Sequence, residues 1–171
     1  VAAVVDRLDI EAGWRFAAVS TLAADLAHTA VFPALCTGGT LDLVDEAVAL
    51  DPAALAERFA AHRPDVLKLV PTHLEALAQA GSLHDLLPAR RLVLGGEELS
   101  PRLAAALSEL EACRVFNHYG PTEATVGVSV YELEQRVAER TPVGSPLGAS
   151  QLYVLDRQQR RVPPGVEGEL Y

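Results

Sequence analysis

Short apolar runs alternate with amphipathic segments along most of the chain, and this alternation limits the fold more than any other feature. The runs span residues 15–19, 40–44, 66–70, 91–94 and 114–117, and they are rich in Val, Leu or Phe. Runs that are mostly apolar throughout are typical of strands buried on both faces. Strands that alternate with helices predict right-handed crossovers. The expected fold class is therefore α/β, with a mostly parallel sheet flanked by helices.

Three segments between these runs carry helix start signals. An Asp-Pro pair at residues 51–52 provides an N-cap and a first turn before residues 53–62, and a Ser-Pro pair at residues 100–101 does the same for a later helix. Pro71 opens a third helix, which Gly81 is expected to end in a left-handed conformation.

The pattern changes near Thr141. Residues 151–155 and 169–171 are short apolar segments, separated by a polar turn rich in proline and glycine. This arrangement predicts an antiparallel hairpin. We therefore expect residues 1–140 to form one α/β subdomain and residues 141–171 to begin a small β-barrel subdomain.

Composition narrows the class of protein. Half of the 171 residues are hydrophobic, with proline and glycine dispersed, which indicates a globular chain. No apolar run reaches the length of a membrane span. The net charge of -9 argues against a nucleic-acid surface, because phosphate neutralisation requires clustered Lys and Arg. The clearest basic cluster, Arg157, Arg160 and Arg161, is interpreted as a solvated turn.

Cysteine usage and the chain ends indicate the setting of the protein. Cys36 and Cys113 lie far apart, with no second Cys or paired His at metal-ligand spacing. Neither a zinc site nor a disulfide framework is indicated, and a cytoplasmic location, where thiols stay reduced, fits best. The sequence contains no Met and opens at Val1 without a secretion signal. We therefore expect a piece of a longer protein.

The strongest local signal is the segment Phe-Asn-His-Tyr-Gly-Pro-Thr-Glu at residues 116–123. Gly120 allows a tight turn and lets the backbone approach a ligand, and Tyr119 offers a flat face for a base. Thr122 and Glu123 offer a hydroxyl and a carboxylate for phosphate and Mg²⁺. The alternative is a Gly-Pro turn beside an exposed acid.

This segment resembles the Asn-x-Tyr-Gly-Pro-Thr-Glu motif of the adenylate-forming superfamily. Residues 94–100 resemble the family's glycine turn beside the adenine, and residues 143–147 and 165–171 resemble its next two motifs. Residues 25–39 resemble the start of the pocket in amino-acid-activating members, although Ala24 replaces the usual Phe. The resemblance covers nearly the whole chain and implies an internal fragment of a nonribosomal peptide synthetase adenylation domain.

The resemblance implies a set of nucleotide-site residues. Thr122 and Glu123 would be catalytic, with Glu123 at the metal. The implied nucleotide-binding residues are Gly95, Gly96, Glu97, Asn117, Tyr119, Gly120 and Thr122.

The resemblance also implies an amino-acid pocket, in which Asp25 holds the substrate α-ammonium. A cation buried without a counter-charge is costly; the alternative is that Asp25 only caps the following helix. The other implied pocket residues are Leu26, Thr29, Lys68, Val93, Gly95, His118, Val126 and Gly127.

Lys68 interrupts an apolar run that is expected to be a buried strand. Lys is almost never fully buried without a partner, so Lys68 requires an anion; the alternative is that its ammonium snorkels out of the strand end. By resemblance, Lys68 and His118 are two potential cations at the far end of the pocket from Asp25, although His118 alone favours a neutral, hydrogen-bonded ring.

A charged end in a pocket of small and apolar residues implies an acidic substrate side chain. The combination resembles the pocket of aspartate-activating domains, whereas asparagine-activating ones tend to have Glu in place of His118. A β-substituted aspartate stays open. Glutamate also stays open, because one methylene is worth only about 1 to 3 kcal/mol of discrimination.

The resemblance implies a reaction in which aspartate and ATP form an aminoacyl-AMP and pyrophosphate, with Mg²⁺, before transfer to a phosphopantetheine thiol. Carrier and condensation domains would be the partners. The chain contains neither the family's phosphate loop nor its C-terminal lobe with the catalytic Lys, so we expect the isolated fragment to be inactive. An acyl- or aryl-CoA ligase relative and a degenerate module without chemistry remain alternatives.

Overall fold

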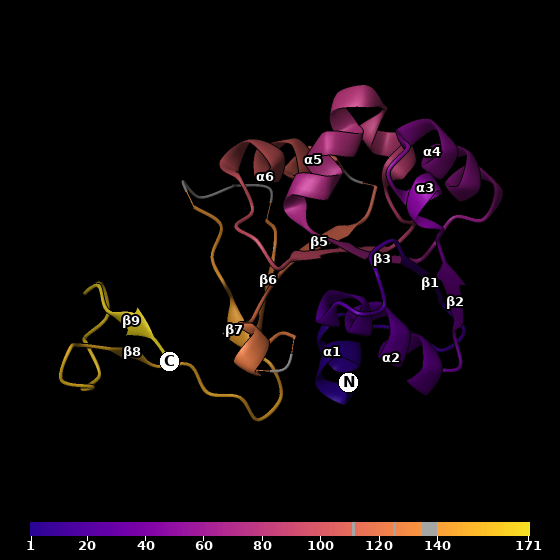
Figure 1. Ribbon diagram of the computed structural model, residues 1–171. Coiled ribbons are helices and arrows are strands. Elements are labelled where there is room, and N and C mark those ends of the chain that lie inside the picture. Colours follow the sequence, from indigo (N-terminus) through magenta and orange to yellow (C-terminus); the bar gives the residue numbers. More distant parts are fainter. Residues whose placement is uncertain (111, 125, 135–139) are drawn as a thin grey trace.

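A seven-stranded sheet in the order β2-β1-β3-β4-β5-β6-β7 forms the centre of the protein (Figure 1). The computed structural model describes residues 1–110, 112–124, 126–134 and 140–171. The pairs from β2 to β5 are parallel, and β6 and β7 are antiparallel. The strands are β1 (Arg15–Ala18), β2 (Thr40–Leu43), β3 (Val66–Leu69), β4 (Arg91–Gly95), β5 (Arg114–Tyr119), β6 (Ser129–Glu132) and β7 (Ser145–Pro146).

Helices cover both faces of this sheet, with α3 to α6 on one face and α1 and α2 on the other (Figure 1). Their bounds are α1 (Ala2–Arg7), α2 (His28–Cys36), α3 (Glu46–Ala49), α4 (Pro52–Ala61), α5 (Pro71–Ala80) and α6 (Pro101–Ser108), with the 3₁₀ helices η1 (Asp25–Ala27), η2 (Leu83–Leu86) and η3 (Thr122–Ala124). The predicted α/β class, with a mostly parallel sheet flanked by helices, is confirmed.

Side chains that alternate along each strand feed two separate cores. On β3, Leu67 and Leu69 pack with residues of α4, α5 and α6. Val66 on the same strand packs on the other face, with residues of α2. Because successive side chains of a strand point to opposite faces, Lys68 lies on the α2 face.

The predicted helix starts at residues 51 and 100 are confirmed in atomic detail. The Asp51 carboxylate accepts hydrogen bonds from the backbone N–H groups of Ala53 and Ala54. The Ser100 hydroxyl accepts one from Leu103. Each bond satisfies a donor that the first turn of a helix leaves free.

Gly81 ends α5, but not as the sequence predicted. Its φ of -141 and ψ of -177 are extended, so the expected left-handed conformation is wrong. A Cβ at Gly81 would lie 2.9 Å from the Cβ of Pro52, the first residue of α4. The glycine is needed for this close approach between helices, not for a positive φ.

The last part of the chain forms the predicted hairpin. Strands β8 (Val154–Leu155) and β9 (Glu169–Leu170) pair antiparallel as a separate two-stranded sheet. Strand β7 still belongs to the large sheet, and the next described strand, β8, belongs to the small one. The chain therefore passes from one sheet to the other between Pro146 and Val154. The subdomain division at residue 141 stays a prediction.

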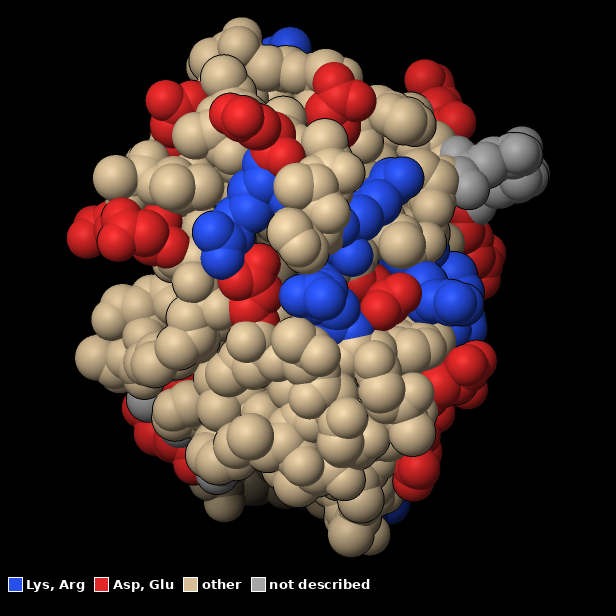
Figure 2. Space-filling model, turned by 90° about the vertical axis from the view of Figure 1, so that its right-hand side faces the viewer, with Lys and Arg blue, Asp and Glu red and all other residues tan. Residues whose placement is uncertain are grey.

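Ion pairs gather at the amino ends of the strands. Arg90, just before β4, pairs with Asp65, just before β3, and Arg114 at the start of β5 pairs with Asp9 and Glu132. Figure 2 shows basic and acidic side chains interspersed across one face of the molecule. Among the described residues, no helix is both long and apolar enough to cross a membrane.

We expect Leu92→Ala to lower the free energy of unfolding by about 2 to 5 kcal/mol, because it opens a cavity in the core. Leu92 is 0% exposed on the central strand β4. Leu35→Ala, at a position 68% exposed on α2, is the matched control and should change stability by less than about 0.5 kcal/mol. Denaturant unfolding of both variants tests this, and equal losses would contradict the assignment of the core.

Candidate functional site

The predicted site residues gather at the carboxyl ends of neighbouring parallel strands. Lys68 on β3 stands beside Val93 on β4, and Gly95 on β4 stands beside His118 on β5. Side-chain alternation puts Lys68, Val93 and His118 on the same face of the sheet, toward α2. In open α/β sheets, ligands bind outside this edge.

Lys68, the only lysine in the sequence, is buried. Its side chain does not snorkel to the surface, because the residue is only 2% exposed. Its Nζ lies 3.4 Å from Nδ1 of His118. Burial lowers the pKa of Lys68 to about 7, and the negative charge of Asp25 opposes that shift.

His118 is buried beside Lys68 and is neutral at physiological pH. Burial, and secondarily the positive charge of Lys68, lower the pKa of His118 to about 3. The far end of the proposed pocket therefore contains one potential cation and one neutral imidazole. Nε2 of His118 is buried and has no hydrogen-bond partner among the described residues.

Asp25 is the first residue of η1, directly before α2. Its side chain makes no capping hydrogen bond: the N-cap of η1 is Ala24 and that of α2 is Ala27. The helix-cap alternative for Asp25 is therefore not supported. The carboxylate is half-buried and close enough to Lys68 to influence its pKa.

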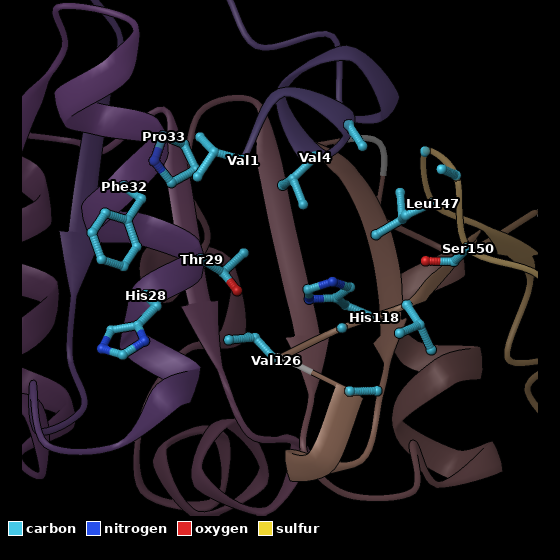
Figure 3. Close-up of a pocket in the computed structure, with 16 residues that line it drawn as sticks. Val1, Val4, His28, Thr29, Phe32, Pro33, His118, Val126, Leu147 and Ser150 are labelled. Carbon is cyan, nitrogen blue, oxygen red and sulfur yellow. The ribbon is translucent and has the colours of Figure 1, made fainter.

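A pocket of about 350 Å³ opens between α2, the end of β5 and the segment after β7 (Figure 3). Thr29, His118, Val126 and Gly127 are the predicted residues that line it. Asp25, Leu26, Lys68, Val93 and Gly95 do not line this pocket.

Sequence reasoning missed several lining residues of this pocket. Phe32 and Pro33 lie three and four positions after Thr29, so helical periodicity alone could have placed them on its face. The residues near the N-terminus and after β7 had no comparable signal. The main unpredicted lining residues are Val1, Val4, His28, Phe32, Pro33, Leu147 and Ser150.

Two glycines leave the room that Lys68 and His118 occupy. A Cβ on Gly95 would lie 2.6 Å from Lys68 Nζ and would collide with the carbonyl oxygen of His118. A Cβ on Gly127 would collide with the His118 ring. Val126 has a φ of 73, which is strained for a β-branched residue. The chain therefore adopts an unfavoured backbone at the wall of the pocket.

A second groove, of about 440 Å³, lies on the other side of His118. The predicted nucleotide-site residues that line it are Gly96, Glu97, Asn117, Tyr119 and Gly120. Gly95 does not line it. Unpredicted lining residues include Glu98, Leu99, Pro121, Arg140, Thr141 and Val143.

Two of these residues have structural partners. Asn117 Nδ2 donates to the carbonyl oxygen of Pro142 at 2.9 Å, which holds one wall of the groove. The Glu97 carboxylate accepts hydrogen bonds from the hydroxyl and the backbone N–H of Thr72. Tyr119 is 37% exposed, so its ring is accessible.

Glu123 lies in η3 with an exposed side chain, whereas the side chain of Thr122 lies outside the described residues. Within the described part of the chain, no three His, Cys, Asp or Glu side chains could together hold a metal ion. One exposed carboxylate still suits Mg²⁺, which protein sites bind through one or two carboxylates plus substrate phosphates.

Comparison with known proteins gives a consistent family. A model of the AMP-binding enzyme family matches residues 1–171. The chain is 37% identical over 159 residues to cyclosporin synthetase simA of Tolypocladium inflatum, covering 91% of this chain and 1% of the synthetase.

Two solved structures share the fold. The first is a four-domain nonribosomal peptide synthetase bound to AMP and glycine, with a TM-score of 0.83, 32% identity, and coverage of 99% of this chain and 12% of that one. The second is the Vibrio cholerae adenylation domain AlmE with glycyl-adenosine-5'-phosphate, with a TM-score of 0.82, 27% identity, and coverage of 99% and 33%. The chain spans only a small part of each relative.

The match over the whole chain decides the family. The chain therefore belongs to the AMP-binding enzyme family, in the type found as adenylation domains of nonribosomal peptide synthetases.

Proposed function

We propose that this chain is part of an adenylation domain that activates aspartate, or a close β-substituted analogue, with ATP. The observation that carries the proposal is the burial of the only lysine, in contact with His118 at the edge of a pocket. A buried ammonium costs stability unless an anion accompanies it. A substrate carboxylate would supply that anion.

The charged groups of the site would each bind one end of an aspartate. Asp25 would bind the substrate α-ammonium, and the Lys68–His118 pair would receive the side-chain carboxylate. Asp25 raises the pKa of Lys68 against the effect of burial, so the two opposite charges belong to one electrostatic environment. Small and apolar residues of the pocket wall, such as Thr29 and Val126, would surround the body of the amino acid.

The groove beyond His118 is our candidate ATP site. Tyr119 would stack on the base, and Gly96 and Gly120 would let the backbone approach the nucleotide. Thr122 would bind phosphate. The residues fit Mg²⁺ through Glu123, and the ion would neutralise phosphate charge there. The four-domain synthetase was solved with AMP and glycine and AlmE with glycyl-adenosine-5'-phosphate, which supports an adenine-nucleotide site in this domain.

Catalysis would depend on how the amino acid and ATP are placed relative to each other. His118 lines both the pocket and the groove, so the amino acid and ATP would lie next to each other, and the α-carboxylate would react with the ATP α-phosphorus. Positioning and charge neutralisation would then account for most of the rate. Transfer of the aminoacyl group to a phosphopantetheine thiol on a carrier domain, next to a condensation domain, would follow.

We expect the intact adenylation domain to catalyse ATP–pyrophosphate exchange best with aspartate or β-methylaspartate, and less well with asparagine and glutamate. Lys68→Met should remove most of the preference for aspartate, because the carboxylate loses its counter-charge. Arg157→Met, at an exposed position, is the control and should leave the preference unchanged.

The same assay separates the alternatives. Exchange with succinate but not with aspartate would favour an acyl-CoA ligase relative. If the intact domain supports exchange with none of these acids, the result would favour a module without catalytic activity. Full retention of the aspartate preference by Lys68→Met would contradict the proposed pocket.

The kcat/KM for aspartate should fall as pH rises above about 7. Burial lowers the pKa of Lys68 to about 7, so the free enzyme loses the positive charge of the pocket above that pH. Of the groups that face Lys68, His118 stays neutral throughout, because its pKa is about 3, and Asp25 favours the charged form of Lys68. Since kcat/KM reports the free enzyme, a pH profile with and without Lys68→Met measures the effect. A profile that Lys68→Met leaves unchanged would contradict it.

Lys68→Met should raise the stability of the domain while it weakens substrate binding. The lowered pKa of Lys68 means that the fold disfavours its charged form. Apolar side chains that replace buried ionic groups are often neutral or stabilising, by up to about 4 kcal/mol where ion pairs were replaced. Thermal unfolding without substrate below pH 7 measures this, and a lower melting temperature would show that the lysine serves the fold.

A further inference from the structure

The two ring nitrogens of His118 have different surroundings. Nδ1 lies 3.4 Å from Nζ of Lys68. Nε2 is equally buried, but no described residue forms a hydrogen bond with it. Leaving a buried polar atom unpaired is unfavourable, so an orphan of this kind at the wall of a pocket points to a role in binding a ligand.

Lys68 determines which nitrogen of His118 carries the proton. An ammonium has three N–H donors and no acceptor. A protonated Lys68 can therefore only donate to Nδ1, which must then present its lone pair. The ring is neutral because its pKa is about 3, so its one proton is on Nε2. The orphan nitrogen is thus a hydrogen-bond donor.

The donor faces the pocket, whereas Lys68 does not line it. His118 lines the cavity, with its ring between Thr29 of α2 and Leu147 (Figure 3). Gly127 lies directly beside Nε2, where a Cβ would collide with that atom. The missing side chain at Gly127 lets the ring occupy this place, so that Nε2 is buried at the wall of the pocket. Lys68 lies behind the ring, on the Nδ1 side.

We propose that the N–H of His118 Nε2 is the direct donor to the side-chain carboxylate of the substrate, and that Lys68 is a positioning residue that acts through His118. This inference rests on the proposed function, because it assigns the contact within the same pocket. Lys68 fixes the tautomer and places a positive charge behind the ring, which strengthens a bond to an anion. A neutral carboxamide would gain less from that charge.

The tautomer can be measured without any substrate. In the intact domain with ¹⁵N-labelled histidine side chains, the signal of His118 is identified by its loss in His118→Phe. Below about pH 7, where Lys68 is protonated, we expect a single neutral form with the proton on Nε2. Lys68→Met should give a mixture of tautomers or the Nδ1–H form. A proton on Nδ1 in the unmodified domain would overturn the proposal.

A double-mutant cycle tests whether Lys68 acts through the ring. Lys68→Met and His118→Phe should each lower kcat/KM for aspartate about 10- to 100-fold, the cost of one charge-assisted hydrogen bond. The double variant should be within about 3-fold of His118→Phe, because coupled residues are not additive. Losses that multiply would show that Lys68 contacts the substrate independently, and would overturn the proposal.

Two further variants keep the test valid if His118→Phe folds poorly. His118→Gln retains an amide donor and should keep more aspartate activity than His118→Phe. Gly127→Ala changes no charge but displaces the His118 ring, because a Cβ would collide with Nε2, and it should therefore raise KM for aspartate. Unchanged KM in Gly127→Ala would count against Nε2 as the donor.

The two kinds of measurement separate this inference from the proposed function. If His118 has the Nε2–H form but the domain activates other amino acids, the proposed substrate is wrong and the tautomer assignment stands. If the domain prefers aspartate but His118 carries its proton on Nδ1, the substrate stands and this inference fails.

Discussion

The candidate site depends on the buried ammonium of Lys68. The protein interior disfavours the positive charge of this group. Burial lowers its pKa to about 7, while Asp25 favours the charged form. The contact with His118 gives the ammonium an acceptor but no counter-charge. The substrate carboxylate that we propose would supply this counter-charge, so a group that weakens the empty fold would contribute to binding. Such a trade between stability and function is typical of binding sites.

Strand β5 carries the residues that connect Lys68 with the rest of the site. Alternation along the strand sends Asn117 to one face, where it holds Pro142 at the second groove, and His118 to the other, beside Lys68. A few consecutive residues thus serve two cavities. The ion pairs of Arg90 and Arg114 lie at the opposite ends of the strands, so the charges that stabilise the fold are separated from those of the site.

Much of the fold could be predicted because its signals are local. The parallel strands and the helix starts follow from runs of apolar residues and from Asp51 and Ser100, whose partners lie within three residues. The error at Gly81 shows the limit of such signals. Sequence reasoning assigned that glycine to a positive φ, but its actual cause is Pro52 on another helix. A contact between distant segments has no local signature.

The sequence by itself determined the alternating elements, the segment at residues 116–123 and the presence of one lysine in an apolar strand. Only the tertiary structure decided that Lys68 is buried rather than extended to solvent, that it meets Nδ1 of His118, and that Nε2 has no partner in the part of the chain that the structure describes. The physical reason is that a strand's periodicity is set by its own backbone. Burial and charge depend instead on which strands pair, in which register, and on what covers their ends.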